Sequence, residues 1–85
     1  MKILRLYKIG VKTKDDEVKK ITFAIAKKAN SDIYSVKTNF KFPIEDDCNE
    51  AMQIIAGSRL DAIYKVIDVE IPGNKGICGI SQISL

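Results

Sequence analysis

The segment from Tyr34 to Phe42 constrains the fold most strongly, because its side chains alternate between two classes without interruption. The first class holds the apolar residues and one threonine: Tyr34, Val36, Thr38, Phe40 and Phe42. Serine, lysine and asparagine fill the positions between them, so the pattern has the two-residue period of a β-strand with one buried face. Pro43 follows, and because proline has no backbone N–H to donate within a sheet, it predicts the end of this strand.

Residues 15–30 carry two overlapping patterns, one helical and one extended. Apolar residues recur at spacings of three and four, as on the buried stripe of a helix: Val18, Ile21, Ile25 and Ala29. Acidic residues at the amino end and a lysine pair near the carboxyl end match the helix dipole. Ile21, Phe23 and Ile25 also alternate with smaller or polar residues, as they would in a strand. The charges at the two ends favour the helix, and the strand stays open as the alternative.

The rest of the chain predicts three further strands and a second helix. A first strand is expected over residues 2–11, where long apolar and basic residues mix. Acidic residues followed by an apolar stripe predict a second helix over residues 45–57, which a glycine closes. β-Branched residues over 62–71, a turn over 72–76 that contains proline and glycine, and a last apolar segment over 77–83 predict a hairpin.

In chain order these elements are strand, helix, strand, helix, strand and strand. A strand–helix–strand beginning implies a crossover connection that places two strands in parallel. The sequence therefore predicts an α+β fold, a two-layer βαβαββ sandwich in which two helices pack on a four-stranded mixed sheet. Because the chain has 85 residues and no linker, residues 1–85 are expected to form a single domain.

Charge is distributed unevenly between the two halves of the chain. Residues 1–42 hold eleven basic and four acidic residues, a net charge of +7, whereas residues 43–85 hold three basic and seven acidic residues, a net charge of −4. A dipolar distribution of this kind allows one surface to hold a polyanion while another meets a different partner. The basic half is therefore the main indication of function in this sequence.

Five lysines are the candidate phosphate-binding residues, chosen by their expected positions. Lys12 and Lys14 are expected in the loop before the first helix, and Lys37 and Lys41 on the exposed face of the second strand. Lys75 is expected at the tip of the hairpin. Lysines at such places contact phosphates and carry little base readout, so the predicted partner is DNA or RNA with low specificity.

Several classes of function have no support in the residues present. The chain has no histidine, which removes the commonest general base and metal ligand. No glycine-rich phosphate loop is present, and Cys48 and Cys78 lack metal-site spacing, so both are expected to be reduced packing residues. No apolar run approaches the about 20 residues of a membrane helix. We therefore expect a cytoplasmic protein that is not an enzyme, carries no cofactor and does not enter membranes.

Three stretches resemble a known family: MKILR at residues 1–5, NEAMQIIA at residues 49–56 and IDVEIPGNKGI at residues 67–77. With the order of elements, they are similar to the Alba superfamily of small chromatin and RNA-binding proteins, and most of all to its stage V sporulation protein S group. The resemblance implies an Alba-like βαβαββ fold. It also implies a homodimer that forms through the second helix and the adjoining strands.

The same resemblance implies where nucleic acid would bind. In the Alba superfamily the nucleic acid crosses a dimer and touches basic residues before the first helix, at the end of the second strand and in the hairpin arm. The corresponding residues in this sequence are Lys12 and Lys14, Lys37 and Lys41, and Lys75. The resemblance and the charge distribution therefore predict the same five positions.

An alternative function is a non-enzymatic module that binds another protein, such as a small regulator or inhibitor. The acidic second half of the chain or an edge strand of the sheet would supply its surface. Phe40 and Phe42 distinguish the two functions, since buried rings indicate a plain core and exposed rings beside Lys37 and Lys41 indicate base stacking or an interface.

Overall fold

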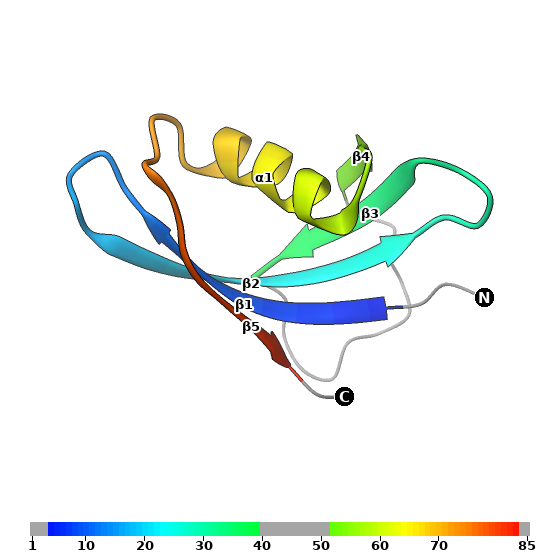
Figure 1. Ribbon diagram of the computed structural model, residues 1–85, viewed down its shortest axis with the longest axis horizontal. Coiled ribbons are helices and arrows are strands. Elements are labelled where there is room, and N and C mark those ends of the chain that lie inside the picture. The colour runs from blue at the N-terminus through cyan, green and yellow to red at the C-terminus, as the bar shows by residue number, and fades with distance from the viewer. Residues whose placement is uncertain (1–3, 40–51, 84–85) are drawn as a thin grey trace.

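The computed structural model describes residues 4–39 and 52–83, and they form a sheet of five antiparallel strands with one helix (Figure 1). The strand order across the sheet is β4-β3-β2-β1-β5. In chain order the elements are β1 Leu4–Lys12, β2 Val18–Lys27, β3 Ile33–Thr38, β4 Met52–Ile55, α1 Arg59–Glu70 and β5 Gly76–Ile83.

The first four strands form a meander, and the helix then carries the chain from one edge of the sheet to the other. β4 is the edge strand beside β3, and β5 is the opposite edge, where it pairs antiparallel with β1. In the central pairs Ile9 lies opposite Ile21 on β2 and opposite Ile80 on β5. Because directly opposite residues project to the same side of a sheet, these three side chains share one face.

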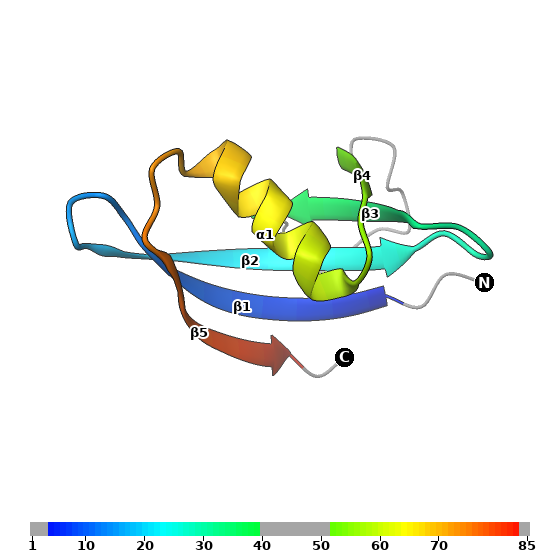
Figure 2. The same ribbon diagram turned by 45° about the horizontal axis from the view of Figure 1, so that its top comes forward.

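The core lies between α1 and one face of the sheet, which we call the helix side (Figure 2). Alternate residues of the three central strands project to the helix side and are buried: Ile9, Val11, Ile21, Phe23, Ile25, Tyr34 and Val36. The helix contributes Ala62, Ile63, Val66 and Ile67 at the three- and four-residue spacing of one buried stripe. Burial of these apolar side chains is the main favourable term that holds α1 on the sheet.

The amino end of α1 is defined by a reciprocal pair of side-chain contacts. The Ser58 hydroxyl accepts a hydrogen bond from the Asp61 N–H at 3.1 Å, and the Asp61 carboxylate accepts one from the Gly57 N–H at 3.0 Å. The Gly57 N–H and then the Lys65 ammonium lower the pKa of the Asp61 carboxyl below its ordinary value of 3.8, against desolvation, which raises it. These contacts satisfy backbone N–H groups that a helix leaves unpaired at its start.

Replacement of Ser58 by alanine is expected to lower the free energy of unfolding by about 1 kcal/mol, because the Asp61 N–H loses its hydrogen-bond acceptor. Urea denaturation of wild type and variant measures this loss. Ser81→Ala is the matched control, since Ser81 is exposed on β5 and its replacement is expected to change stability by less than about 0.5 kcal/mol. Equal midpoints for the two variants would contradict a stabilising role for the cap.

The predicted βαβαββ arrangement, with two helices on a four-stranded mixed sheet, is wrong. Every strand pair is antiparallel, the sheet has five strands, and one helix lies among the described residues. The first strand, the strand that begins near Tyr34 and the last strand are confirmed as β1, β3 and β5. The last strand pairs with β1, so the predicted hairpin between residues 62–71 and 77–83 is also wrong.

The helix predicted over residues 15–30 is wrong, and the alternative, a strand, is confirmed as β2. The acidic residues that favoured a helix lie instead in the tight turn between β1 and β2. In that turn the Thr13 N–H donates to the Glu17 carbonyl at 2.8 Å, and Asp16 has a left-handed φ of 63°. Acidic residues fit an exposed turn as well as the start of a helix, so these residues did not distinguish the two structures in the sequence.

In the second half of the chain, a helix is observed where a strand was predicted, and a strand where a helix was predicted. Residues 59–70 form α1, although β-branched residues in this region favoured a strand. Met52–Ile55, inside the predicted second helix, form strand β4 instead, so these residues do not supply the helix on which the dimer interface was expected. The rest of that predicted helix and the end of the predicted strand at Phe40 and Phe42 lie outside the described residues.

Candidate polyanion-binding face

The face of the sheet turned away from α1, which we call the far face, divides into a buried part and an exposed lysine part. Leu6, Ala24, Ala26 and Ser35 project to this face and are buried. Further along β1 and β2 the far face carries exposed lysines: Lys8, Lys12 and Lys20. We call these three residues the lysine face.

Strand register brings the three lysines together. Lys20 on β2 lies directly opposite Gly10 on β1, and Lys8 and Lys12 flank Gly10 at two residues on either side. Diagonal neighbours in an antiparallel pair lie about 7–8 Å apart, so each β1 lysine is within reach of any group that Lys20 contacts. The register therefore places three lysine residues around one glycine.

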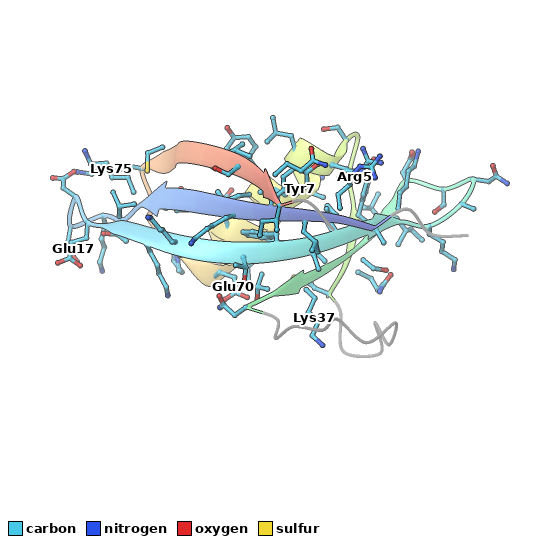
Figure 3. The ribbon with its side chains drawn as sticks, turned by 90° about the horizontal axis from the view of Figure 1, so that it is seen from below. Arg5, Tyr7, Glu17, Lys37, Glu70 and Lys75 are labelled. Atoms are coloured by element: carbon cyan, nitrogen blue, oxygen red, sulfur yellow. The ribbon has the colours of Figure 1, made fainter. Side chains whose placement is uncertain are left out.

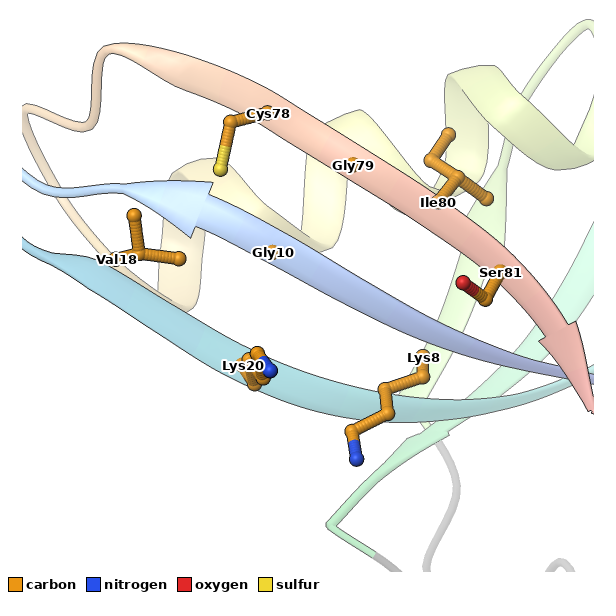
Figure 4. A pocket seen from close by; sticks show the side chains of 8 residues that line it. All are labelled: Lys8, Gly10, Val18, Lys20, Cys78, Gly79, Ile80 and Ser81. Carbon is orange, nitrogen blue, oxygen red and sulfur yellow. The ribbon is translucent and has the colours of Figure 1, made fainter.

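A hollow of about 400 Å³ lies beside these lysines, over a floor without side chains (Figure 4). The floor is formed by Gly10 and Gly79, which lie opposite each other on β1 and β5. Its walls are formed mainly by side chains of the three neighbouring strands: Lys8, Val18, Lys20, Cys78 and Ser81. A Cβ atom added at Gly10 would lie 3.3 Å from the Cys78 sulfur, so a side chain at this position would fill part of the hollow.

A register shift on β5 shapes the same hollow. Gly10 pairs with Gly79 and the next residue, Val11, pairs with Ile77, which leaves Cys78 as an extra residue. Such a bulge increases the local twist of an edge strand and turns a side chain to a new direction. Here the sulfur of Cys78 lies beside Gly10, and the cysteine is free and exposed. Cys78 is free, as predicted, but because it is exposed the prediction that it is a packing residue is wrong, and Cys48 lies outside the described residues.

The charge on the lysine face has a single sign. Among the described strand residues of the far face there is no aspartate or glutamate, whereas the helix side carries Asp61, Asp68 and Glu70 on α1. Within the described ranges the ion pairs are Lys65 with Asp61 and Lys75 with Asp16, and neither includes a residue of the lysine face. Uncompensated like charges on one surface raise the local concentration of anions and speed their association.

Three of the five predicted lysines meet at one end of the sheet. The Lys75 N–H donates to the Lys12 carbonyl at 2.7 Å, and Lys14 lies in the adjacent turn, where a Cβ atom at Gly73 would be 3.9 Å from its Cβ. The ammonium of Lys75 pairs with Asp16, so part of its charge is compensated within the protein.

The other two predicted lysines are not joined to this group. Lys37 is half-buried on β3, opposite Ala24, and lies well away from Lys75 and Glu17 on the far face (Figure 3). Lys41 lies outside the described residues. The five predicted positions therefore do not form one cluster in the part of the chain that the structure describes, and Lys12 alone of the five belongs to the lysine face.

Lys8 and Lys20 were missed as site residues for different reasons. Lys20 was placed in a predicted helix, where it would share no face with β1. Lys8 lies within the strand expected over residues 2–11, but its neighbours on the far face depend on which strand pairs with β1. The alternation of β2 contained the signal for Lys20, because the buried residues Ile21, Phe23 and Ile25 require Lys20 to project to the opposite face.

Other kinds of site find no support in the described residues. In the described ranges no group of three or more acidic or cysteine side chains is placed to hold a metal ion. None of the described helices has the length and apolar character that crossing a bilayer requires. Comparison of the chain with family models, curated proteins and solved structures finds no match. The resemblance to the Alba superfamily stays a prediction, and the fold that it implies differs from the one observed.

Proposed function

We propose that this protein binds DNA or RNA without sequence specificity, by holding backbone phosphates on the lysine face. The observation that carries the proposal is the convergence of Lys8, Lys12 and Lys20 on one exposed surface whose described strand residues include no carboxylate. Phosphate contacts supply most of the affinity of non-specific nucleic-acid binding, because each one releases condensed counterions. Lys14 and Lys75 lie beyond the end of the sheet, where Asp16 pairs with Lys75 and compensates part of the charge.

The hollow over Gly10 and Gly79 supports close approach of a phosphate backbone. A floor without side chains lets the ligand reach the surface of the sheet, while Lys8 and Lys20 lie along the side of the hollow nearest β2 (Figure 4). The Ser81 hydroxyl lies at the same rim and offers a donor of the kind that contacts phosphate oxygens. The shape of the site therefore favours an extended anion rather than a small enclosed ligand.

The absence of sequence preference follows from the residues available on this surface. The described residues of the lysine face and its hollow include no aromatic ring, asparagine or glutamine, the side chains that most often stack on bases or read their edges. Lysine ammonium groups contact phosphates as point charges. The proposed role is non-enzymatic, and a cytoplasmic location and a homodimer belong to the same proposal.

A salt titration tests the proposal, and two neighbouring lysines provide a matched pair of variants. Lys20 projects to the far face, whereas Lys19 lies opposite Val11 and projects to the helix side. Three phosphate contacts predict that log affinity falls with log salt concentration with a slope of about −2 to −3 per copy of the chain. Lys20→Ala is expected to reduce that slope by about one unit per copy. Fluorescence anisotropy with labelled DNA and RNA measures it.

Lys19→Ala removes the same charge from the same strand and is expected to leave the slope nearly unchanged. Equal effects of the two variants would show that binding depends on net charge and not on the lysine face. A protein that binds neither nucleic acid at low salt would contradict the proposal itself.

A second candidate function, binding of a protein partner, is favoured by the outer surface of α1. Val69 is 64% exposed there, beside the exposed acidic residues Asp68 and Glu70. The two carboxylates would complement a basic partner, and Val69 would supply an apolar contact between them. Absence of nucleic-acid binding in the titration, together with capture of a defined protein that Val69→Lys abolishes, would favour this function.

A further inference from the structure

The outer edge of β5 lacks the features that usually protect an edge strand. β5 is eight residues long and its sequence, GICGISQI, contains no charged residue and no proline, in a chain of which 29% is charged. Edge strands of natural proteins are usually short, charged or interrupted by proline, because their free N–H and C=O groups pair readily with another strand. The opposite edge strand, β4, is only four residues long.

The bulge at Cys78 does not remove this edge. It lies near the amino end of β5, and from Gly79 to Ile83 the pairing with β1 is regular. A regular strand that is paired on one side presents alternate backbone groups on its other side. Among residues 4–39 and 52–83 no strand pairs with the outer side of β5, so the second half of β5 can accept a further strand.

The helix side has exposed apolar side chains on β5 itself and on α1. Ile80 is 47% exposed and shares its face with Ile9, and Leu60 and Tyr64, one helical turn apart on α1, are 45% and 44% exposed. The Lys65 ammonium donates a hydrogen bond to the Ile55 carbonyl of β4 at 2.9 Å, so the flank of α1 that carries Lys65 faces β4. The helical spacing places Leu60 and Tyr64 on the opposite flank of α1, away from β4.

We infer that two copies of this chain pair through β5, antiparallel, about a two-fold axis perpendicular to the sheet. The result is a continuous sheet of twice the five strands observed. Residues near a two-fold axis meet their own counterparts, so a charged residue there would face a like charge. β5 has no charged residue to repel its copy. On the helix side the exposed Ile80 of each copy would be covered by the other.

This pairing deepens the proposed function, because it doubles the lysine face. An axis perpendicular to the sheet keeps both far faces on the same side, so the three lysines of each copy border one continuous surface. The pairing itself rests on β5 alone. Only the consequence for binding rests on the proposed function.

The solution mass of the purified full chain tests the pairing without any nucleic acid. Light scattering at micromolar and higher concentrations is expected to give twice the 9.5 kDa mass of one chain. Ile80→Lys is expected to give the mass of a single chain, because it places two like charges at the paired edge. Val69→Lys adds the same charge at an exposed apolar position of α1 and is expected to remain a dimer. Circular dichroism confirms that each variant is folded.

A wild-type protein that stays monomeric at high concentration would overturn the inference, and so would a dimer that both variants leave intact. The salt titration then separates this inference from the proposed function. Ile80→Lys is expected to lower the magnitude of the slope from about 5 to about 3, because half of the lysines leave the surface. An unchanged slope in a monomeric variant would overturn the shared surface, whereas absence of binding by a dimer would contradict only the proposed function.

Discussion

Replacement of Phe23 by alanine is expected to lower the free energy of unfolding by about 3–5 kcal/mol. Phe23 lies in the middle of β2 and is completely buried in the core cluster on the helix side. Truncation removes most of the ring from an interior packed at crystal-like density, and the cavity is only partly filled by relaxation. Because small domains have a stability of about 5–15 kcal/mol, this single change is expected to remove much of it. Urea denaturation followed by circular dichroism measures the loss.

Val18→Ala is the informative control for this experiment. The helix predicted over residues 15–30 would bury Val18 in its stripe and expose Phe23, whereas the observed strand does the opposite: Val18 is 57% exposed. Val18→Ala is therefore expected to change stability by less than about 0.5 kcal/mol. A large loss on Val18→Ala with little loss on Phe23→Ala would contradict the register of β2 and favour the helix.

Strands were predictable where alternation was strict and no other pattern competed with it. β1 and β3 show the two-residue period, and the residues on their buried faces, such as Ile9 and Val36, are in the observed core. The last strand was recognisable from its apolar residues and from the preceding turn. In that turn Gly73 and Gly76 have positive φ values of 75° and 101°, which glycine adopts without strain.

The exchanged elements show why local pattern did not decide the rest. In α1 the β-branched residues Ile63, Val66 and Ile67 favour a strand by their propensity, yet their spacing also fits the buried stripe of a helix. The cap at Ser58 and Asp61 was the competing local signal. Strand propensity is a property of packing on a sheet more than of the backbone, so it did not distinguish these alternatives.

The candidate site was only partly predictable, since a site on a sheet depends on strand order. The basic half of the chain was evident, but Lys12, which was expected in a loop before a helix, is the last residue of β1 and is exposed on the far face. Lys20 joins it only because β2 pairs with β1 in a register that sets Lys20 opposite Gly10. Gly79 comes to the same place from the other end of the chain, through an edge pairing that the predicted hairpin excluded.

Reversal of the three charges of the lysine face is expected to weaken nucleic-acid binding by about 100- to 1000-fold near 0.1 M salt. The variant combines Lys8→Glu, Lys12→Glu and Lys20→Glu. It lowers the formal net charge by six, from +3 to −3. Loss of the three contacts removes their counterion release, and the new carboxylates repel the phosphates. Fluorescence anisotropy at several salt concentrations measures both the affinity and the slope.

A second triple variant separates the position of the charges from their number. Lys19→Glu, Lys27→Glu and Lys28→Glu change the net charge by the same amount, but Lys19 and Lys27 project to the helix side and Lys28 lies in the turn after β2. Long-range repulsion alone is screened beyond about 10 Å at 0.1 M salt, so this control is expected to weaken binding far less, by about 10-fold or below. Equal losses for the two triple variants would mean that phosphates are attracted by overall charge, and the lysine face would then have no special role in binding.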